Sequence, residues 1–398
     1  MKRAIVIGCD INGLGAIRSL ALENFHIIAM YYDPMEFAHA SKHVHEKVKI
    51  PHPRVEKKEL IEFLIANSAR WKDALLIETN DEALIAVSKN KDKLEKHYKI
   101  ATPEWNVLRT FIEKPETYKL AEKCGVPYPK TLLPKTLDEL NRIKDEIEYP
   151  CILKPILSHE FFNRFKSKNF EARNPNELSI KFELCRASGH EVMVQEIIPG
   201  PDSNIFQCIM YISSDGNSNA TFLDRKVRQN PPRFGVARVA ISEDVIPQIR
   251  EFTETMLKEG GFTGIAHSEF KKDPRDNEFK LMEINGRTSR SNWLATYCGV
   301  NLPWVTYMDL VEKEQIEVRD YKKGVYWIEL YQDIANSLLR YDKENLGLKD
   351  YIEPYLSKDK TFADLSKGDF MPFLKRISLL PMKHYMFSKS RINSSLHA

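Results

Sequence analysis

Residues 280–287 read KLMEINGR and place three side chains that can hold ions at alternating positions. Side chains two residues apart in a β-strand point to the same face, so Glu283, Asn285 and Arg287 are expected to form one row. The apolar neighbours of Glu283 would point to the opposite face. A carboxylate, an amide oxygen and a guanidinium in one row suit a divalent cation and the phosphate groups that it binds.

A further acidic side chain lies in the segment before this row. Residues 264–286 predict a β-hairpin whose turn carries the sequence DPRDN. Antiparallel pairing would bring Glu269 opposite Glu283 and Asn285. Oxygen donors that converge from two neighbouring strands suit Mg²⁺, a hard cation that keeps some of its waters and bridges substrate phosphates. The alternative is a solvated strand that carries ordinary surface acids.

The first part of the chain is predicted to form a separate domain. Strand-like runs (RAIVIG, HIIAMYYD and DALLIETND) alternate with helical segments up to about residue 105. This alternation predicts a doubly wound parallel α/β domain over residues 1–105.

The glycine-rich stretch GCDINGLG joins the first expected strand to the first expected helix. Such a junction could bind a phosphate, and Asp33 lies at about the distance expected of the ribose-binding acid of an NAD site. However, the spacing of Gly8, Gly13 and Gly15 matches neither the dinucleotide nor the Walker fingerprint. A tight strand-to-helix turn is therefore the favoured interpretation, with a substrate-facing loop and an NAD site as alternatives.

Residues 106–315 show a different order of predicted strands and helices. Short strands such as YPCILKPI, which carries Lys154, and EVMVQEII alternate with amphipathic helices and antiparallel strand pairs, which predicts α+β structure. The apolar segment GVYWIELYQDIANSLLRY is expected to pack on the rest of the molecule. It belongs to a C-terminal extension over residues 316–398 that ends in a basic tail from about residue 376.

The composition excludes several classes of protein. A length of 398 residues predicts two or three domains. The formal net charge of +3 is too small to indicate by itself that the protein binds nucleic acid. The six cysteines form no C-x-x-C pair, so a reducing, cytoplasmic setting is expected, without disulfides or structural zinc. The start becomes polar too soon for a signal peptide, and no run approaches the ~18 apolar residues of a membrane span.

These segments resemble the ATP-grasp superfamily over roughly residues 106–315. MEINGR is similar to its metal-binding Glu-x-Asn stretch, YPCILKP to its phosphate-contacting strand and VMVQEIIPG to its adenine hinge. The resemblance implies two α+β lobes with a hinge near residues 195–202, and ATP and Mg²⁺ as cofactors, with Mn²⁺ as an alternative ion. It assigns the metal to Glu269, Glu283 and Asn285; the phosphates to Lys114 and Lys154; adenine to Gln195, Glu196, Ile197 and Ile198; and the ribose to Asp202.

Four further stretches resemble the D-aspartate ligase and carbamoyl-phosphate-synthase-like group of that superfamily: VIGCDINGLGAIRSL, ASKHVHEKVKIPHP, ETNDEAL and DRKVRQNPPRFGVAR. The resemblance implies an ATP-dependent carboxylate–amine ligase whose first domain supports the acceptor side. Its expected partners are a small-molecule carboxylate and a small-molecule amine, and a homodimer is one form of assembly. Arg287, Arg225 and Lys154 are then the expected catalytic residues.

The stretch DRKVRQNPPR places several basic side chains on one expected strand and on the loop after it. Recognition of an anionic substrate is one interpretation, with Arg225 as its leading candidate. A solvated basic face and contact with RNA are the alternatives, and the stretch lacks the interleaved aromatic residues that would favour RNA.

Two departures from the superfamily pattern leave other functions open. The segment ILSHEFFNRFKSKNF after Lys154 has no glycine, so Lys166 or Lys168 would have to supply the phosphate contact of a glycine-rich loop. Gln195 stands where Glu is more usual. The alternative functions are a regulatory nucleotide-binding protein without turnover and, less readily, an NAD-dependent oxidoreductase.

Overall fold

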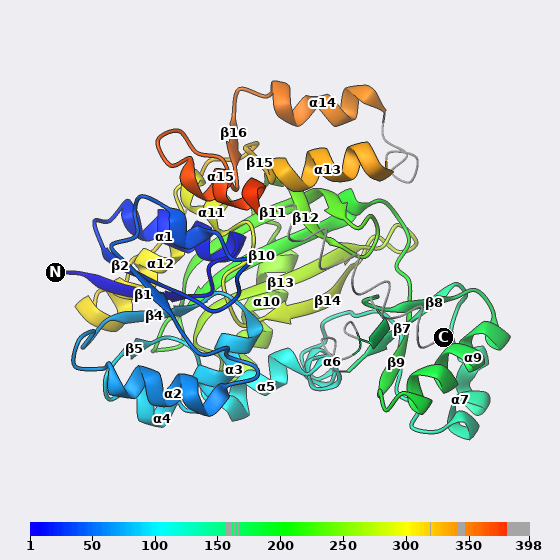
Figure 1. The fold of residues 1–398 in the computed structure, drawn as a ribbon. Helices are drawn as coiled ribbons and strands as arrows, with labels where there is room; N and C mark the ends of the chain where they lie inside the picture. The colour runs from blue at the N-terminus through cyan, green and yellow to red at the C-terminus, as the bar shows by residue number, and fades with distance from the viewer. Residues whose placement is uncertain (157–160, 162–163, 166, 319, 341–346, 380–398) are drawn as a thin grey trace.

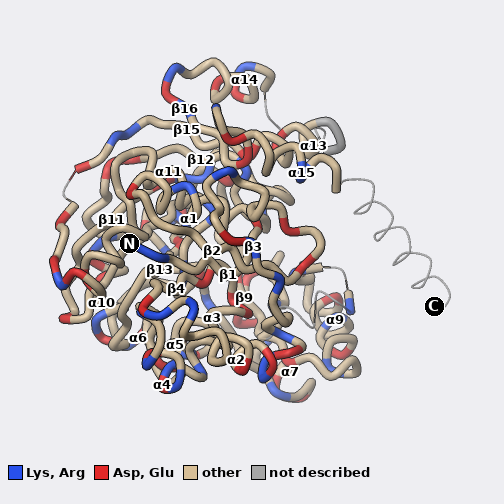
Figure 2. The backbone as a smooth tube through the Cα atoms, turned by 60° about the vertical axis from the view of Figure 1, so that its left-hand side comes forward, with Lys and Arg blue, Asp and Glu red and all other residues tan. Residues whose placement is uncertain are grey.

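The computed structural model describes residues 1–398 except 157–160, 162–163, 166, 319, 341–346 and 380–398. Within the described residues the chain forms three β-sheets with helices packed against them (Figure 1). Lys and Arg are interspersed with Asp and Glu along the chain (Figure 2). None of the helices described is both long and apolar enough to cross a membrane.

The N-terminal part is a parallel sheet of strand order β3-β2-β1-β4-β5 with helices on both faces, the doubly wound arrangement that the sequence predicts. Val6 and Ile27 face the core beside α1, whereas Ile5 and Ile28 face the core beside α2 and α3. The elements are β1 (Arg3–Ile7), α1 (Ile11–Ala21), β2 (His26–Tyr31), β3 (Glu46–Lys49), α2 (Lys57–Ala66), β4 (Leu75–Glu78), α3 (Asp81–Ser88), α4 (Lys91–Leu94) and β5 (Lys99–Ile100).

The second sheet belongs to a small lobe, on the lower right of Figure 1. Its order is β6-β9-β7-β8, all pairs are antiparallel, and α7 and α9 close its apolar core. Asn174 begins α9 by accepting a backbone hydrogen bond from Glu177. The lobe comprises β6 (Thr131–Leu132), α7 (Leu137–Ile143), β7 (Cys151–Pro155), β8 (Phe170–Ala172), α9 (Pro175–Ala187) and β9 (Val192–Glu196). The helices that precede it, α5 (Trp105–Ile112) and α6 (Lys114–Lys123), pack on the large sheet.

The third and largest sheet has the order β14-β13-β10-β11-β12-β15-β16. Cys208 and Met210 of β10 pack toward α5, α6 and α10, while Ile209 and Tyr211 pack toward α12 and the N-terminal domain. This sheet therefore lies between two cores. Its elements are β10 (Ile205–Ile212), β11 (Ser218–Asn230), β12 (Val236–Ser242), α10 (Pro247–Glu259), β13 (Gly264–Lys272), β14 (Phe279–Asn285), α11 (Asn292–Cys298) and α12 (Leu302–Tyr307).

The segment after residue 315 continues the large sheet. Strand β15 (Tyr326–Ile328) pairs with β12, and β16 (Lys360–Phe362) pairs in parallel with β15. Asp333 is buried between Arg228 Nη2 at 2.9 Å and Arg238 Nε at 3.2 Å. Arg228 therefore joins this segment to the sheet. The remaining elements are α13 (Leu330–Arg340), α14 (Leu348–Leu356) and α15 (Met371–Ser378).

Candidate active site

Two acidic side chains face each other across neighbouring strands of the large sheet. Glu269 of β13 and Glu283 of β14 are directly opposed in the antiparallel register, and Asn285 lies opposite His267. The Asn285 amide nitrogen donates to Glu283 Oε1 at 3.3 Å, which leaves the amide oxygen as the group able to bind a cation. The predicted row of Glu269, Glu283 and Asn285 is thus brought together in space.

A β-bulge determines which way Glu283 points. The register shifts after Glu269, so that Leu281 rather than Met282 lies opposite the next residue of β13. Leu281 and Ile284 are buried in the core beneath the sheet, whereas Met282 is only half buried. The strict alternation expected from the sequence is therefore wrong at Met282. The extra residue lets Glu283 oppose Glu269 while Ile284 stays in the core.

Lysine side chains converge on these acids from separate elements. Lys226 of β11 places its Nζ 2.7 Å from Glu269 Oε2, and both side chains are largely buried. Burial by itself raises the pKa of the Glu283 carboxyl, but the charges of Lys114 and Lys226 lower that pKa to about 2. Lys154 acts in the same direction. Glu283 is therefore ionised at neutral pH and faces a cationic surrounding.

Gln195 fixes the ammonium group of Lys154. Lys154 Nζ donates to Gln195 Oε1 at 2.6 Å, and the fully buried Gln195 donates from Nε2 to Tyr118 Oη at 2.9 Å and Thr131 Oγ1 at 2.8 Å. Burial, assisted by the charge of Lys114, lowers the pKa of Lys154 to about 8. The sequence predicts that the Gln195 side chain faces adenine, but both its amide oxygen and its amide nitrogen form hydrogen bonds within the protein.

Arg287 lies just beyond the end of β14 and reaches the N-terminal domain. Its Nε donates to Asp81 Oδ1 at 2.6 Å and its Nη2 to Asp81 Oδ2 at 3.4 Å. Asp81 begins α3, so the ETNDEAL stretch contributes directly to this region. Burial, and then the charge of Arg287, lower the pKa of His267 to about 3, which keeps this imidazole neutral beside the acids.

Arg225 lies apart from this cluster. Successive side chains of a strand point to opposite faces, so Arg225 and Lys226 diverge. Lys226 reaches Glu269, whereas Arg225 Nε donates to Glu243 Oε1 at 2.6 Å. The structure therefore does not bring Arg225 to the acids, and Lys226 is the basic side chain of β11 that the sequence reasoning missed. The motif signalled a basic strand but not which of its faces the site would use.

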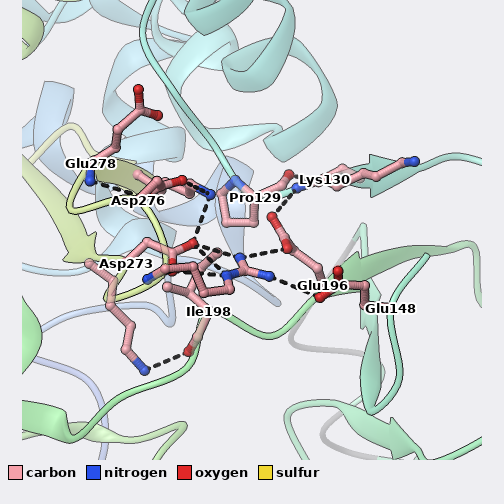
Figure 3. A network of polar contacts seen from close by, with 12 residues as sticks. Pro129, Lys130, Glu148, Glu196, Ile198, Asp273, Asp276 and Glu278 are labelled. Carbon is pink, nitrogen blue, oxygen red and sulfur yellow. Dashed lines mark hydrogen bonds and ion pairs between the residues drawn. The ribbon is translucent and has the colours of Figure 1, made fainter. Parts of the chain in front are cut away.

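The hinge segment that follows β9 runs between the two lobes. Asp202 Oδ1 accepts hydrogen bonds from Gln229 Nε2 at 2.9 Å and from the Arg233 amide at 3.2 Å. The side chain of Glu196 turns toward the backbone of Lys130 (Figure 3). The side chain of the predicted ribose acid, Asp202, is thus bonded to β11 and to the loop after it, while the backbone of residues 196–198 carries the predicted adenine contacts.

The glycine-rich stretch forms a tight turn. A Cβ on Gly13 would lie 2.1 Å from the Gly8 carbonyl oxygen, and Gly8 has a φ of +96°. Asp10 caps α1 by accepting from two backbone N–H groups of its first turn, at 2.9 and 3.3 Å. Asp33 accepts from the Met35 amide at 2.7 Å. Because a carboxylate of the chain itself occupies the helix N-terminus, the geometry favours the tight-turn interpretation over a phosphate or NAD site.

One of the two candidate loop lysines can be located. Lys168 is an exposed residue; partial desolvation lowers its pKa, and the charges of Glu283 and Lys226 are close enough to act on it as well. Lys166 lies outside the described residues. Lys168 is thus the basic side chain of this segment that the structure associates with the acids.

The donor set fits Mg²⁺ and nucleotide phosphates. Among the described residues no group of three or more His, Cys, Asp and Glu side chains is arranged to hold a metal. The chain instead offers two carboxylates and an amide oxygen, which suits an ion that takes its remaining ligands from water and substrate phosphates. Lysines that outnumber the two carboxylates they face would gain from anionic phosphate groups.

Comparison with known proteins reveals relatives in both sequence and fold. No protein-family model matches this chain. It is 29% identical over 313 residues to D-aspartate ligase of Enterococcus faecium, covering 75% of this chain and 74% of that ligase.

Many solved structures share the fold, and two of them illustrate the likeness. An N5-carboxyaminoimidazole ribonucleotide synthetase in complex with ADP has a TM-score of 0.65 at 14% identity, covering 86% of this chain and 85% of that one. The biotin carboxylase domain of Hydrogenobacter thermophilus 2-oxoglutarate carboxylase, with MgADP and bicarbonate, has a TM-score of 0.64 at 18% identity. This alignment covers 82% of this chain and 73% of that chain.

Proposed function

We infer that this chain belongs to the ATP-grasp superfamily of ATP-dependent carboxylate–amine ligases. On this premise we propose that it activates an amino-acid carboxylate and joins it to an amine. ATP and Mg²⁺ are its cofactors. The observation that carries the proposal is the opposed pair Glu269 and Glu283, with Asn285 beside them and the ammonium groups of Lys114 and Lys154 acting on Glu283.

The proposed reaction has two steps. A carboxylate oxygen attacks the γ-phosphorus of ATP, and the bond from that phosphorus to the β,γ-bridging oxygen breaks. ADP departs, and the carboxylate has become an acyl phosphate. The nitrogen of the amine then attacks the acyl carbon, the C–O bond to phosphate breaks, and the nitrogen loses a proton. Such phosphoryl transfer depends on placement and charge neutralisation rather than on covalent help from the protein.

Each residue of the site has a part in this scheme. Lys114 and Lys154 would hold the phosphates, and Glu269, Glu283 and Asn285 would hold Mg²⁺. When bound, this ion offsets the charge of the β- and γ-phosphate oxygens. Arg287, kept in place by Asp81, would steady the oxygens of the transferring phosphoryl group.

An acidic amino acid is the first carboxylate to test. Lys226 and Lys168 place further positive charge beside the acids, which suits a substrate with a second carboxylate. The relative of highest sequence similarity described above is a D-aspartate ligase, so D-aspartate leads the panel.

Hydroxylamine trapping tests the proposal. The protein is incubated with Mg-ATP, hydroxylamine and a panel of amino acids and small carboxylic acids, and hydroxamates are sought by mass spectrometry. Arg287→Ala is expected to lose the hydroxamate while it still binds ATP. A carboxylate that stimulates ADP release yet yields neither hydroxamate nor amide would contradict ligation and point to phosphorylation alone.

The proposed setting is the cytoplasm, where ATP is available. The cysteines of the chain, Cys9 among them, are free thiols, in keeping with a reducing compartment. A homodimer is the proposed assembly, by analogy with the biotin carboxylase domain, which was solved as a dimer. Sedimentation of the purified protein tests this assembly.

A further inference from the structure

The hairpin that carries the acids also contacts the small lobe. Arg275 lies in the turn between β13 and β14, and its Nη2 donates to Glu196 Oε2 at 2.9 Å. Its Nη1 donates to Glu148 Oε2 at 3.0 Å. Figure 3 shows Glu196 and Glu148 of the small lobe turned toward Asp273 of the hairpin turn. We call this contact between the lobes the Arg275 bridge.

Both ends of the Arg275 bridge are held by other groups. Asp273 is fully buried and accepts from Arg275 Nη2 at 2.6 Å and from Lys280 Nζ at 2.7 Å. Although burial raises the pKa of Asp273, these two cations hold it well below its usual range. On the other side, Glu196 Oε1 accepts from the Lys130 amide at 2.8 Å. The bridge is therefore an ordered network, unlike an isolated surface ion pair.

A second contact joins the same hairpin to the hinge. Lys271 lies two residues after Glu269, and therefore on the same face of β13. Its buried Nζ donates to the carbonyl oxygens of Ile198 at 2.8 Å and Gly200 at 3.0 Å. The strand that supplies an acid to the candidate metal site thus also binds the backbone next to the expected adenine contacts.

We propose that Arg275, together with Lys271, is a positioning residue that sets the separation between the adenine hinge and the acids that face the phosphates. The hinge belongs to the small lobe and the acids belong to the large sheet, so contacts between the lobes determine how one nucleotide spans both. A displacement of about 1 Å at the reacting groups is enough to lower the rate of an enzyme strongly. The inference rests on the proposed function, in which ATP is the nucleotide.

Nucleotide binding without carboxylate or amine provides the test. Calorimetry on the full chain compares adenosine, which contacts the hinge alone, with MgATP, which needs the hinge and the acids together. Arg275→Ala is expected to lower the affinity for MgATP about tenfold, which is the scale of one charge-assisted hydrogen bond. The affinity for adenosine should change by less than about twofold. Arg275→Lys should recover part of the loss because it keeps the charge but not the planar fork.

Two further variants make the test specific. Glu196→Gln removes the bridge from the small-lobe side and leaves Asp273 paired with its two cations, so it should reproduce the selective loss of MgATP affinity. Glu146→Gln is the matched control: Glu146 is an exposed acid of the same lobe that takes no part in the Arg275 bridge, so its loss should leave both affinities unchanged.

The possible results are distinct. Equal weakening of adenosine and MgATP by Arg275→Ala would mean that the residue only maintains the fold of the hinge, and unchanged MgATP affinity would mean that the bridge has no role. Either result overturns the inference and leaves the proposed ligase standing. Failure of the wild-type protein to bind MgATP would contradict the proposed function itself, and the inference with it.

Discussion

At the scale of single residues, the charge of each side chain depends on its partners. Glu283 is ionised because lysines surround it, and Lys154 loses part of its affinity for a proton because it is buried beside Lys114. Its hydrogen-bond partner, Gln195, is neutral and supplies no counter-charge. These relations give two predictions for nucleotide turnover and binding.

Glu283→Gln keeps the shape of the side chain and removes its charge. We expect Mg²⁺-dependent ADP release to fall by at least ~10³-fold with the fold retained, because a key electrostatic group facing the phosphates is lost. Glu278→Gln, an exposed acid at the turn of the same hairpin, is the control and should keep its activity. Normal ADP release by the Glu283 variant would remove this residue from the site.

The lowered pKa of Lys154 leads us to expect that ATP binding depends on pH. Its pKa in the free protein is about 8, and the ammonium form is the one that attracts phosphates. ATP affinity should therefore be constant below about pH 8 and fall as the pH rises through this value, whereas AMP affinity should change little. Calorimetry from about pH 6.5 to about pH 9.5, on either side of that pKa, measures both affinities.

The same experiment on Lys154→Ala supplies the control. This variant should bind ATP more weakly than the wild type, bind AMP nearly as well, and lose the dependence on pH. Equal losses for ATP and AMP would show that Lys154 contacts the nucleotide somewhere other than its outer phosphates.

At the scale of elements, the turn from β1 to α1 depends on close approach of the backbone. A Cβ at Gly13 would lie 2.1 Å from the Gly8 carbonyl oxygen, whereas a Cβ at Gly15 would meet Trp293 N at 3.3 Å. Gly13→Ala should lower the free energy of unfolding by about 2–3 kcal/mol, as for an overpacked core, and Gly15→Ala by less. Urea denaturation followed by circular dichroism measures both, and equal stability of the two variants would contradict the argument.

At the scale of the whole molecule, the segment after residue 315 is joined to the large sheet by buried charge. Asp333→Asn leaves Arg228 and Arg238 without their shared counter-charge, and should lower the free energy of unfolding by about 3 kcal/mol. Asp359→Asn is the control, since its pair with Lys322 is about half exposed and contributes less than about 1 kcal/mol. Similar denaturation midpoints for both variants would show that Asp333 does not hold this segment.

The sequence by itself determined the features that depend on local periodicity. Alternating strands and helices predicted the doubly wound N-terminal sheet. A two-residue spacing within β14 predicted that Glu283 and Asn285 share a face, and the hairpin pattern brought Glu269 opposite them. Such features depend on residues a few positions apart, whose relative directions follow from strand geometry alone.

The tertiary structure alone decided which partners distant side chains take. Arg287 binds Asp81 across 206 positions of the chain, Gln195 turns inward to Lys154, and Lys226 rather than Arg225 reaches the acids. A bulge after Glu269 broke the expected alternation at Met282, and neighbouring side chains on a strand point to opposite faces, so the choice between them depends on which face the sheet buries. These contacts depend on which strands, far apart in the chain, pair or pack together, and no local pattern in the sequence encodes that.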